Sequence, residues 1–451
     1  MKKNKIYSLL YLGLWILPLY FFMRDFFFLE EIKNIDIKEI MDLFKVSLVQ
    51  GSLSVILSTL IAIIPAYYMS CKNNKISRML EGLIFIPFFF PTISTVVAFT
   101  LIFKLPFLKN FSILYTLKSI IIANIFYNSP IMIKYLSQGM INIPKNIIEA
   151  SKIDGLNEIQ VFFKIKLPLI LPQVFRGMFL VFIYTFSSFG IVMALGGIKY
   201  SNLEVEIAST LMKDADFTKA LVLGIFQFII LISINIFGDK LPSYELSGEK
   251  LEKKVSLKVT IYTLLFLFFE YLVLAIGVIY GFFNYYTGKI SLEPLLILFN
   301  KSFNESYPVI DALRNSIILA GITPIFVIIF SYLLLKNYSK LTGGIVFSTL
   351  GFSSAFLGIA LIYINIIYDV QLWILLICGY TLITVPIAYS FMYQYITEFP
   401  KDILELAKLD KLSKIKTFIL IEFPILKKIF LATYLQIFAI ILGEFTISYS
   451  M

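Results

Sequence analysis

Long apolar segments alternate with short polar ones along almost the whole chain. About 11 such segments follow one another, punctuated by Lys, Asn or Pro. A helix of roughly 20 apolar residues is long enough to cross about 30 Å of hydrocarbon. The pattern therefore predicts an all-α polytopic membrane protein with about 11 transmembrane helices. The predicted spans lie near residues 7–23, 45–69, 80–103, 117–136, 168–195, 218–238, 257–283, 312–335, 342–366, 371–394 and 424–449.

Composition and charge agree with this pattern. Hydrophobic residues make up 59% of the 451 residues and charged residues only 15%, which excludes a soluble protein. The net charge of +10 does not require a nucleic-acid partner, because basic residues of membrane proteins gather on the cytoplasmic side. Placing the N-terminus in the cytoplasm puts most of the 39 Lys and Arg there, including the Lys240–Lys258 cluster. We therefore predict a multi-pass membrane protein whose N-terminus lies in the cytoplasm.

The N-terminal segment has a basic start and an apolar run, so a signal peptide is the competing interpretation. The large residues Phe21, Phe22 and Met23 follow the run where a cleavage site would need small ones. The segment is therefore predicted to be the first membrane helix. The chain has no His and only two Cys, Cys71 and Cys378, which are not spaced as metal ligands. No metal site is expected.

One polar segment occurs twice. EASKIDGLNEIQVFFKIKLP at Glu149–Pro168 and ELAKLDKLSKIKTFILIEFP at Glu405–Pro424 superpose with an offset of 256 residues. The same offset pairs Pro130 with Pro386 in the preceding span and Phe189 with Phe445 in the following one. Six predicted spans separate the two copies, an even number, so both copies point the same way. The chain is therefore predicted to be a parallel repeat of two helical bundles.

The repeat predicts a domain organisation. Residues 1–238 form the first transmembrane half, with a cytoplasmic loop at 144–168, and 259–451 form the second, with its loop at 400–424. The polar stretch 239–258 is predicted to be a cytoplasmic linker. Met451 aligns with Leu195, so the second half is expected to be shortened at its C-terminus, without an equivalent of the sixth span of the first half.

Each copy of the loop is predicted to be a helix, a bend and a second helix. Pro144 and Pro400 suit the first turn of a helix, where the missing N–H has no partner in any case. Gly155 can leave that helix in a left-handed conformation. Asn157 can cap a second helix that leads to the membrane.

The pattern Glu149-Ala150-Ser151, Gly155, Ile165, Leu167, Pro168 resembles the EAA loop of permease subunits of bacterial ABC importers. The resemblance implies two loops that dock on two ATP-hydrolysing subunits, which would bind ATP and Mg²⁺, so no cofactor is expected in this chain. It also implies an extracytoplasmic solute-binding protein as a partner. The second copy departs from the pattern, most clearly with Lys411 at the glycine position, so the two docking sites are expected to differ in geometry or strength. The predicted docking residues are Glu149, Ala150, Ser151, Asp154, Gly155, Glu405, Ala407, Asp410 and Lys411.

The solute is predicted from shorter strings. FSSFGIVMALGG at Phe186–Gly197, LEVEIA at Leu203–Ala208 and ANIFYNSP at Ala123–Pro130 resemble thiamine permeases most closely, with the related ferric-iron permeases as the alternative. Glu444 beside an aromatic ring would favour a cation; the competing interpretation is a carboxylate satisfied by a neighbouring helix. Polar residues near the helix prolines are candidates to line the pathway or to bond between helices. The pathway candidates are Asn128, Ser187, Ser188, Phe189, Thr384, Glu444 and Phe445.

The sequence also argues against a chain that hydrolyses ATP itself. It contains no G-x-x-x-x-G-K-[ST] phosphate-binding loop. The leading hypothesis is thus a permease subunit that forms the translocation pathway and is not an enzyme. The alternative from another class is a secondary transporter driven by an ion gradient, which is disfavoured because the chain lacks His and has few membrane-embedded acids.

Overall fold

The structure is a computed structural model that describes residues 6–28, 30–239, 254–284 and 287–451. Its regular structure is almost entirely helical; the strands in the described residues are β1 (Phe283–Asn284) and β2 (Lys289–Ile290), which pair antiparallel. The all-α prediction is confirmed. The predicted linker at 239–258 falls mainly on residues outside the described ones.

The first half of the chain builds twelve α-helices and several short 3₁₀ or π turns. In chain order the elements are α1 (Ile6–Phe26), η2 (Glu31–Asn34), α2 (Ile37–Cys71), α3 (Lys75–Phe85), η3 (Pro87–Phe89), α4 (Thr92–Phe103), α5 (Pro106–Lys109), α6 (Leu117–Ile141), α7 (Lys145–Ile153), α8 (Glu158–Val161), η4 (Phe162–Lys166), α9 (Leu167–Phe186), α10 (Gly190–Leu195), η5 (Ile198–Tyr200), α11 (Leu203–Ser209), η6 (Thr210–Asp214) and α12 (Phe217–Asp239).

The second half follows a similar order of elements. After α13 (Leu257–Tyr280) and the two strands come α14 (Glu293–Ile297), α15 (Lys301–Ser306), α16 (Val309–Lys336), α17 (Lys340–Ser348), η7 (Thr349–Gly351), α18 (Ser354–Tyr368), α19 (Leu372–Thr397), α20 (Lys401–Leu409), α21 (Lys414–Thr417), η8 (Phe418–Glu422), α22 (Phe423–Gly443) and α23 (Thr446–Ser450).

Eight helices in the described residues are long and apolar enough to cross a membrane, or up to 10 if each of two bent pairs is one span. The predicted spans near 80–103 and 342–366 are these bent pairs. The chain turns by 91° between the two helices of each pair. Pro91 lies at the first turn, in an extended conformation that ends the preceding helix. Ser353 lies at the second and caps α18 by accepting a hydrogen bond from the Phe356 amide.

The first helix of each half packs against the bent pair of the other half. Helix α1 lies along α18, and α13 lies along α4. On the α13 side, the Tyr271 hydroxyl donates a hydrogen bond to the Leu83 carbonyl over 3.0 Å. Each half therefore packs its first helix against the other half, and these two contacts help to hold the halves together.

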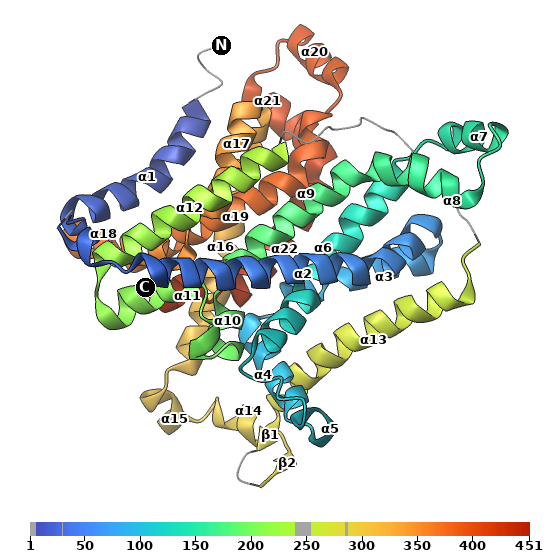
Figure 1. Ribbon diagram of the computed structural model, residues 1–451. Helices are drawn as coiled ribbons and strands as arrows, with labels where there is room; N and C mark the ends of the chain where they lie inside the picture. Colours follow the sequence, from blue (N-terminus) through green and yellow to red (C-terminus); the bar gives the residue numbers. More distant parts are fainter. Residues whose placement is uncertain (1–5, 29, 240–253, 285–286) are drawn as a thin grey trace.

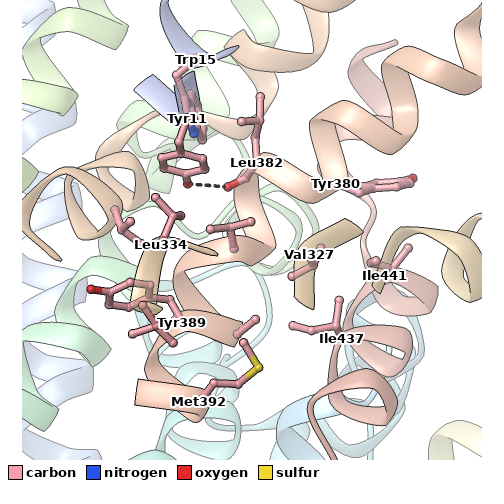
Figure 2. Packing of buried hydrophobic residues seen from close by; sticks show 14 of the residues in the cluster. Tyr11, Trp15, Val327, Leu334, Tyr380, Leu382, Tyr389, Met392, Ile437 and Ile441 are labelled. Atoms are coloured by element: carbon pink, nitrogen blue, oxygen red, sulfur yellow. Dashed lines mark hydrogen bonds between the residues drawn. The ribbon is translucent and has the colours of Figure 1, made fainter. Parts of the chain in front are cut away.

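The largest hydrophobic cluster fills the second half and includes two residues of α1, Tyr11 and Trp15. Pro386 in α19 has no N–H, so the Leu382 carbonyl one turn earlier loses its helical partner. The Tyr11 hydroxyl replaces it with a hydrogen bond of 3.2 Å, drawn as a dashed line in Figure 2. Tyr11 of the first half thus supplies the hydrogen bond that Pro386 removes from α19 of the second half.

The two predicted loops lie toward the same end of the bundle. In Figure 1, α7 with α8 and α20 with α21 project from the upper and right-hand edges, while the strands, α14 and α15 lie at the lower edge. This is the placement that a pair of equivalent docking elements requires.

Candidate functional site

The first copy of the repeated loop folds as a helix, a bend and a second helix. Helix α7 begins directly after Pro144 and ends at a left-handed Gly155, which has φ +79°. Asn157 caps the second helix by accepting the Gln160 amide over 2.9 Å, and the Gln160 side chain accepts the Asn157 amide in return. The expected bend and cap are therefore both present.

The second copy has the same bend. Lys411 has φ +53°. Its Leu412 amide bonds to the Ala407 carbonyl, as the Leu156 amide bonds to the Ser151 carbonyl in the first copy. Gly155 and Lys411 therefore share the left-handed conformation at this turn, although the lysine carries a Cβ atom. That conformation costs about 1 kcal/mol for a residue with a Cβ atom. A difference in docking strength stays a prediction.

Most of the predicted docking residues face outward. Glu149, Ala150, Asp154, Gly155, Glu405, Asp410 and Lys411 are exposed, whereas Ser151 and Ala407 are buried against their own loops. The Glu149 carboxylate is 3.1 Å from the Lys145 ammonium, one turn earlier on the same exposed helix face. Such an exposed pair contributes little to stability. It leaves Glu149 free to exchange its partner.

A hydrophobic residue at the end of each first helix was missed at the sequence level. Ile153 is 86% exposed and Leu409, its equivalent in the second copy, is 76% exposed. A large apolar side chain repeated at the same exposed position indicates a contact with another molecule. Its signal in the sequence was an apolar residue directly before the acidic Asp154 or Asp410 in each copy.

The interface between the halves brings together two of the predicted pathway residues. Phe189 and Phe445 occupy equivalent positions in the repeat, and their rings stack with centroids 6.1 Å apart and planes inclined by 20°. Tyr449 packs against both rings. Ala208 and Ala355 complete this small cluster. The stack is thus a direct contact between the two halves in this structure.

Both aromatic residues lie where a long helix breaks. The predicted spans 168–195 and 424–449 are not continuous: α9 ends at Phe186 and α22 at Gly443. At the first break the Ser187 hydroxyl bonds to the Ile183 carbonyl, and the Asn202 side chain donates to the Ser188 carbonyl over 2.8 Å. Ser187 and Ser188 therefore shape the backbone that carries the stacked ring.

Glu444 has a local structural role at the second break. Its carboxylate accepts hydrogen bonds from the Thr446 and Ile447 amides, at 2.8 and 3.1 Å, and so caps α23. The prediction that Glu444 attracts a cationic solute is not tested by this arrangement. The Glu444 carboxylate is, however, already hydrogen-bonded to backbone amides of the same chain.

Asn128 and Thr384 are buried and bond within their own helices. The Asn128 side chain donates to the Asn124 carbonyl over 2.7 Å, and the Thr384 hydroxyl to the Tyr380 carbonyl over 2.6 Å. A bond between helices is made instead by Asn124, whose side chain donates to the Ser54 hydroxyl. Among the described residues, neither Asn128 nor Thr384 forms a hydrogen bond with the residues of the Phe189–Phe445 stack. Their proposed lining role stays a prediction.

A buried polar contact between the halves was also missed. Glu204 on α11 is 1% exposed and accepts hydrogen bonds from the Gln227 side chain at 2.6 Å and from the Ser353 hydroxyl at 2.9 Å. The Ala355 amide lies 3.4 Å from the same carboxylate. We call Glu204, Gln227, Ser353 and Ala355 the Glu204 network. It ties the first half to the N-terminus of α18, at the 91° bend.

Burial raises the pKa of the Glu204 carboxyl, and the hydrogen bonds from Gln227 and Ser353 lower it only in part. The sequence carried a signal, an acid inside the apolar string LEVEIA. Its partner Ser353 is 149 positions away, so no local pattern could identify it.

Comparison with known proteins gives a family match within residues 54–242, mostly in the first half of the chain. Residues 54–242 match the family described as binding-protein-dependent transport system inner membrane component. This match includes the loop at 144–168 and covers less than half of the chain. These matches support an ABC importer permease.

Individual relatives are similar to this chain over part of its length and part of their own. A permease protein named for sulfate transport from Helicosporidium is 26% identical over 192 residues, 40% of this chain and 71% of the relative. One named for 2-aminoethylphosphonate transport from Salmonella typhimurium is 24% identical over 196 residues, 41% of this chain and 66% of the relative. The thiamine transport system permease protein of Escherichia coli is 27% identical over 128 residues, 28% of this chain and 24% of the relative. The relatives are named for different solutes, so their names select no solute for this chain.

Proposed function

We propose that this chain is the membrane-spanning subunit of an ATP-driven importer and forms the translocation pathway between its two halves. The observation that carries the proposal is the pair of equivalent helix–bend–helix elements, α7–α8 and α20–α21, each exposing an apolar side chain at one end of the bundle. Two ABC ATPase subunits would dock there, and an extracytoplasmic binding protein would deliver the solute at the other end.

The coupling is proposed to run through continuous helices. Each second loop helix joins, through a π-helical turn, the long helix that ends at Phe186 or Gly443. A displacement of α7–α8 or α20–α21 would move these helix ends and separate the Phe189–Phe445 stack. ATP binding to the partners would then shift the two halves between open states by differential affinity.

The test is a reconstituted complex with the cognate ATPase in proteoliposomes. Ile153→Asp places a charge at the predicted contact, where burial of an isoleucine contributes about 2 kcal/mol, so ATPase affinity should fall about 30-fold. Glu149→Arg should abolish ATP-dependent uptake while membrane insertion is retained. Ile290→Asp, an exposed isoleucine at the other end of the bundle, is the matched control. Uptake driven by a proton or sodium gradient without ATP would instead establish a secondary transporter.

The solute is a separate question. Thiamine or a similar cation is the proposal that the resemblance favours, with ferric iron as the alternative. It is supported by the short apolar strings and by a thiamine permease relative that matches over 28% of this chain. Mass spectrometry of the ligand carried by the cognate binding protein would decide between them.

A further inference from the structure

A short helix exposes an apolar surface at the end of the bundle opposite the docking loops. The residues of α14 and its immediate neighbours read LEPLLILF at Leu292–Phe299, which we call the α14 segment, and Glu293 is its one charged residue. Leu296 is 63% exposed and Phe299 is 69% exposed, and most of the other apolar side chains of the segment are exposed as well. In Figure 1 the helix lies at the lower edge, between α15 and the two strands. Apolar side chains gathered in this way indicate a contact with another molecule or with a membrane.

The start of the α14 segment is tied to the end of a membrane-spanning helix. Helix α13, one of the candidate spans, ends at Tyr280. Two residues later, the Phe282 carbonyl accepts a hydrogen bond from the Ser291 amide over 2.8 Å, next to the pairing of β1 with β2. The Glu293 carboxylate accepts a hydrogen bond from the Asn284 side chain. The segment therefore begins beside the end of α13, and its carboxylate is bonded to a neighbouring side chain.

The end of the α14 segment is tied to the start of the next span. The Asn304 side chain donates a hydrogen bond to the Leu298 carbonyl and accepts one from the Ile310 amide over 3.0 Å. Ile310 is the second residue of α16, another candidate span. The next residues include an exposed ion pair between Arg314 and Asp311, and charged side chains near the end of a span lie at the membrane interface. Helix α14 is therefore held at the level where two spans meet the membrane surface.

The neighbouring short helix has the opposite exposure. The exposed side chains of α15 are all polar, whereas its aromatic Phe303 is partly buried and packs against the Tyr307 ring. The polar ones are Lys301, Ser302, Glu305 and Ser306. A helix in water exposes polar side chains and buries apolar ones, as α15 does. The α14 segment does the reverse, so water is not its expected surrounding.

The backbone of the α14 segment is already satisfied. The amides of Leu296, Leu298 and Phe299 donate hydrogen bonds to carbonyls three or four residues earlier, over 2.9–3.2 Å. A backbone bonded in this way can enter an apolar surrounding without leaving polar groups unpaired. Val278 near the end of α13 and Leu313 near the start of α16 are also exposed, on helices that lipid surrounds. The apolar surface of both spans thus continues into the segment between them.

We propose that α14 lies in the membrane interface and that the apolar side chains of the α14 segment contact lipid acyl chains of the leaflet opposite the docking loops. An in-plane helix of this kind buries its apolar face about 5–10 Å into the boundary between headgroups and acyl chains. The polar α15 faces water. Helix α13 packs on α4 of the first half, whereas α16 belongs to the second half. The lipid contact would therefore restrain helix ends on both halves when they move relative to each other.

Fluorescence quenching in nanodiscs measures the depth of the segment. Cys71 and Cys378 are first changed to Ser, and Leu296→Cys or Phe299→Cys then carries an environment-sensitive fluorophore; both positions are exposed, so the label displaces no buried side chain. Phosphatidylcholine with nitroxides at two acyl positions should quench both labels and place them about 5–10 Å below the headgroups. Glu305→Cys on α15 is the matched control. Its label should be quenched mainly by a water-soluble nitroxide.

Three results would overturn the proposal. The first is stronger quenching of the labels at 296 and 299 by the water-soluble nitroxide than by the lipid-bound ones. The second is shielding from water that appears only when the cognate binding protein is added, because that protein would then cover the surface. The third is shielding found only in nanodiscs that hold two copies of the chain, which would make the surface a dimer contact. None of these results depends on the transported solute or on ATP hydrolysis, so the proposed function is tested separately.

Discussion

Replacement of Glu204 by Ala is the sharpest test of how the two halves are held together. The substitution removes the acceptor for the Gln227 side chain and the Ser353 hydroxyl, at 2.6 and 2.9 Å. Each hydrogen bond to a charged group contributes about 1.5–3 kcal/mol, and the donors left behind would be buried without partners. Relief of the desolvation of the carboxylate offsets part of the loss. We expect a net destabilisation of about 3–5 kcal/mol, because two buried neutral donors lose their acceptor.

The expected change in melting temperature follows from the size of the chain. An unfolding entropy of about 2.1 cal/mol/K per residue gives roughly 1 kcal/mol per kelvin for 451 residues, so Glu204→Ala should melt about 3–5 °C lower. Melting of the purified protein in detergent can be followed with a thiol-reactive dye, because Cys71 is buried and becomes reactive on unfolding.

Two variants serve as controls for this measurement. Glu204→Gln keeps the shape, and its amide can donate to the Gln227 carbonyl oxygen, which has no partner among the described residues, so the cost should be about 1 kcal/mol. Glu206→Ala, two residues away, removes only a partly exposed pair with Lys219 and should cost under about 1 kcal/mol. If Glu204→Ala melted within 1 °C of the unchanged protein, the network would not hold the halves together.

Three further outcomes are expected. Gly155→Ala should destabilise by about 1 kcal/mol through its positive φ alone, since a Cβ atom there meets nothing within 4 Å, and Lys411→Gly should stabilise by a similar amount; equal melting of all three proteins would contradict this. Tyr11→Phe should cost about 1–2 kcal/mol, because the carbonyl freed by the proline of α19 loses its donor, whereas Tyr7→Phe at an exposed ring should cost nothing measurable. The raised pKa of Glu204 means that the folded protein binds its proton more tightly than the unfolded chain, so its contribution to stability is present at low pH and falls as pH rises above the usual carboxyl range. Melting curves from pH 5 to 8 should show this slope in the unchanged protein relative to Glu204→Gln, and parallel curves would refute it.

Local sequence rules predicted the loop elements well. Proline before the first helix, a left-handed residue at its end and Asn157 at the next N-cap are all determined by a few neighbouring residues. The same rules could not predict the 91° bend between α17 and α18. Its first-half counterpart has Pro91, whereas the second half has Ser353, which is compatible with many conformations. There the direction of the chain depends on Glu204 and on α1, both distant in sequence.

The interface between the halves was predictable only in part. The 256-residue offset paired Phe189 with Phe445, and related positions in two similar bundles meet near their common axis, so their contact follows from the repeat. The offset could not identify Glu204, because no residue of the described second half is its equivalent. The sequence also suggested a role for Glu444 from its charge alone, whereas its carboxylate accepts hydrogen bonds from the Thr446 and Ile447 amides.

The backbone of the two halves repeats more faithfully than their side chains do. Both second loop helices enter the membrane through a π-helical turn, at 162–166 and 418–422. At the end of that turn the first half has Lys166, which is partly buried, while the second has Glu422, which is buried and bonded to the Tyr332 hydroxyl and the Lys336 ammonium. Breaking such a buried ion pair by removing one partner is costly. We therefore expect a displacement of α20–α21 to be transmitted to the second bundle through Glu422. This transmission should be more direct than that from α7–α8 to the first bundle. Unequal coupling of two similar loops would then follow from one buried carboxylate, and not from the drift of Gly155 to Lys411, since both residues adopt the same bend.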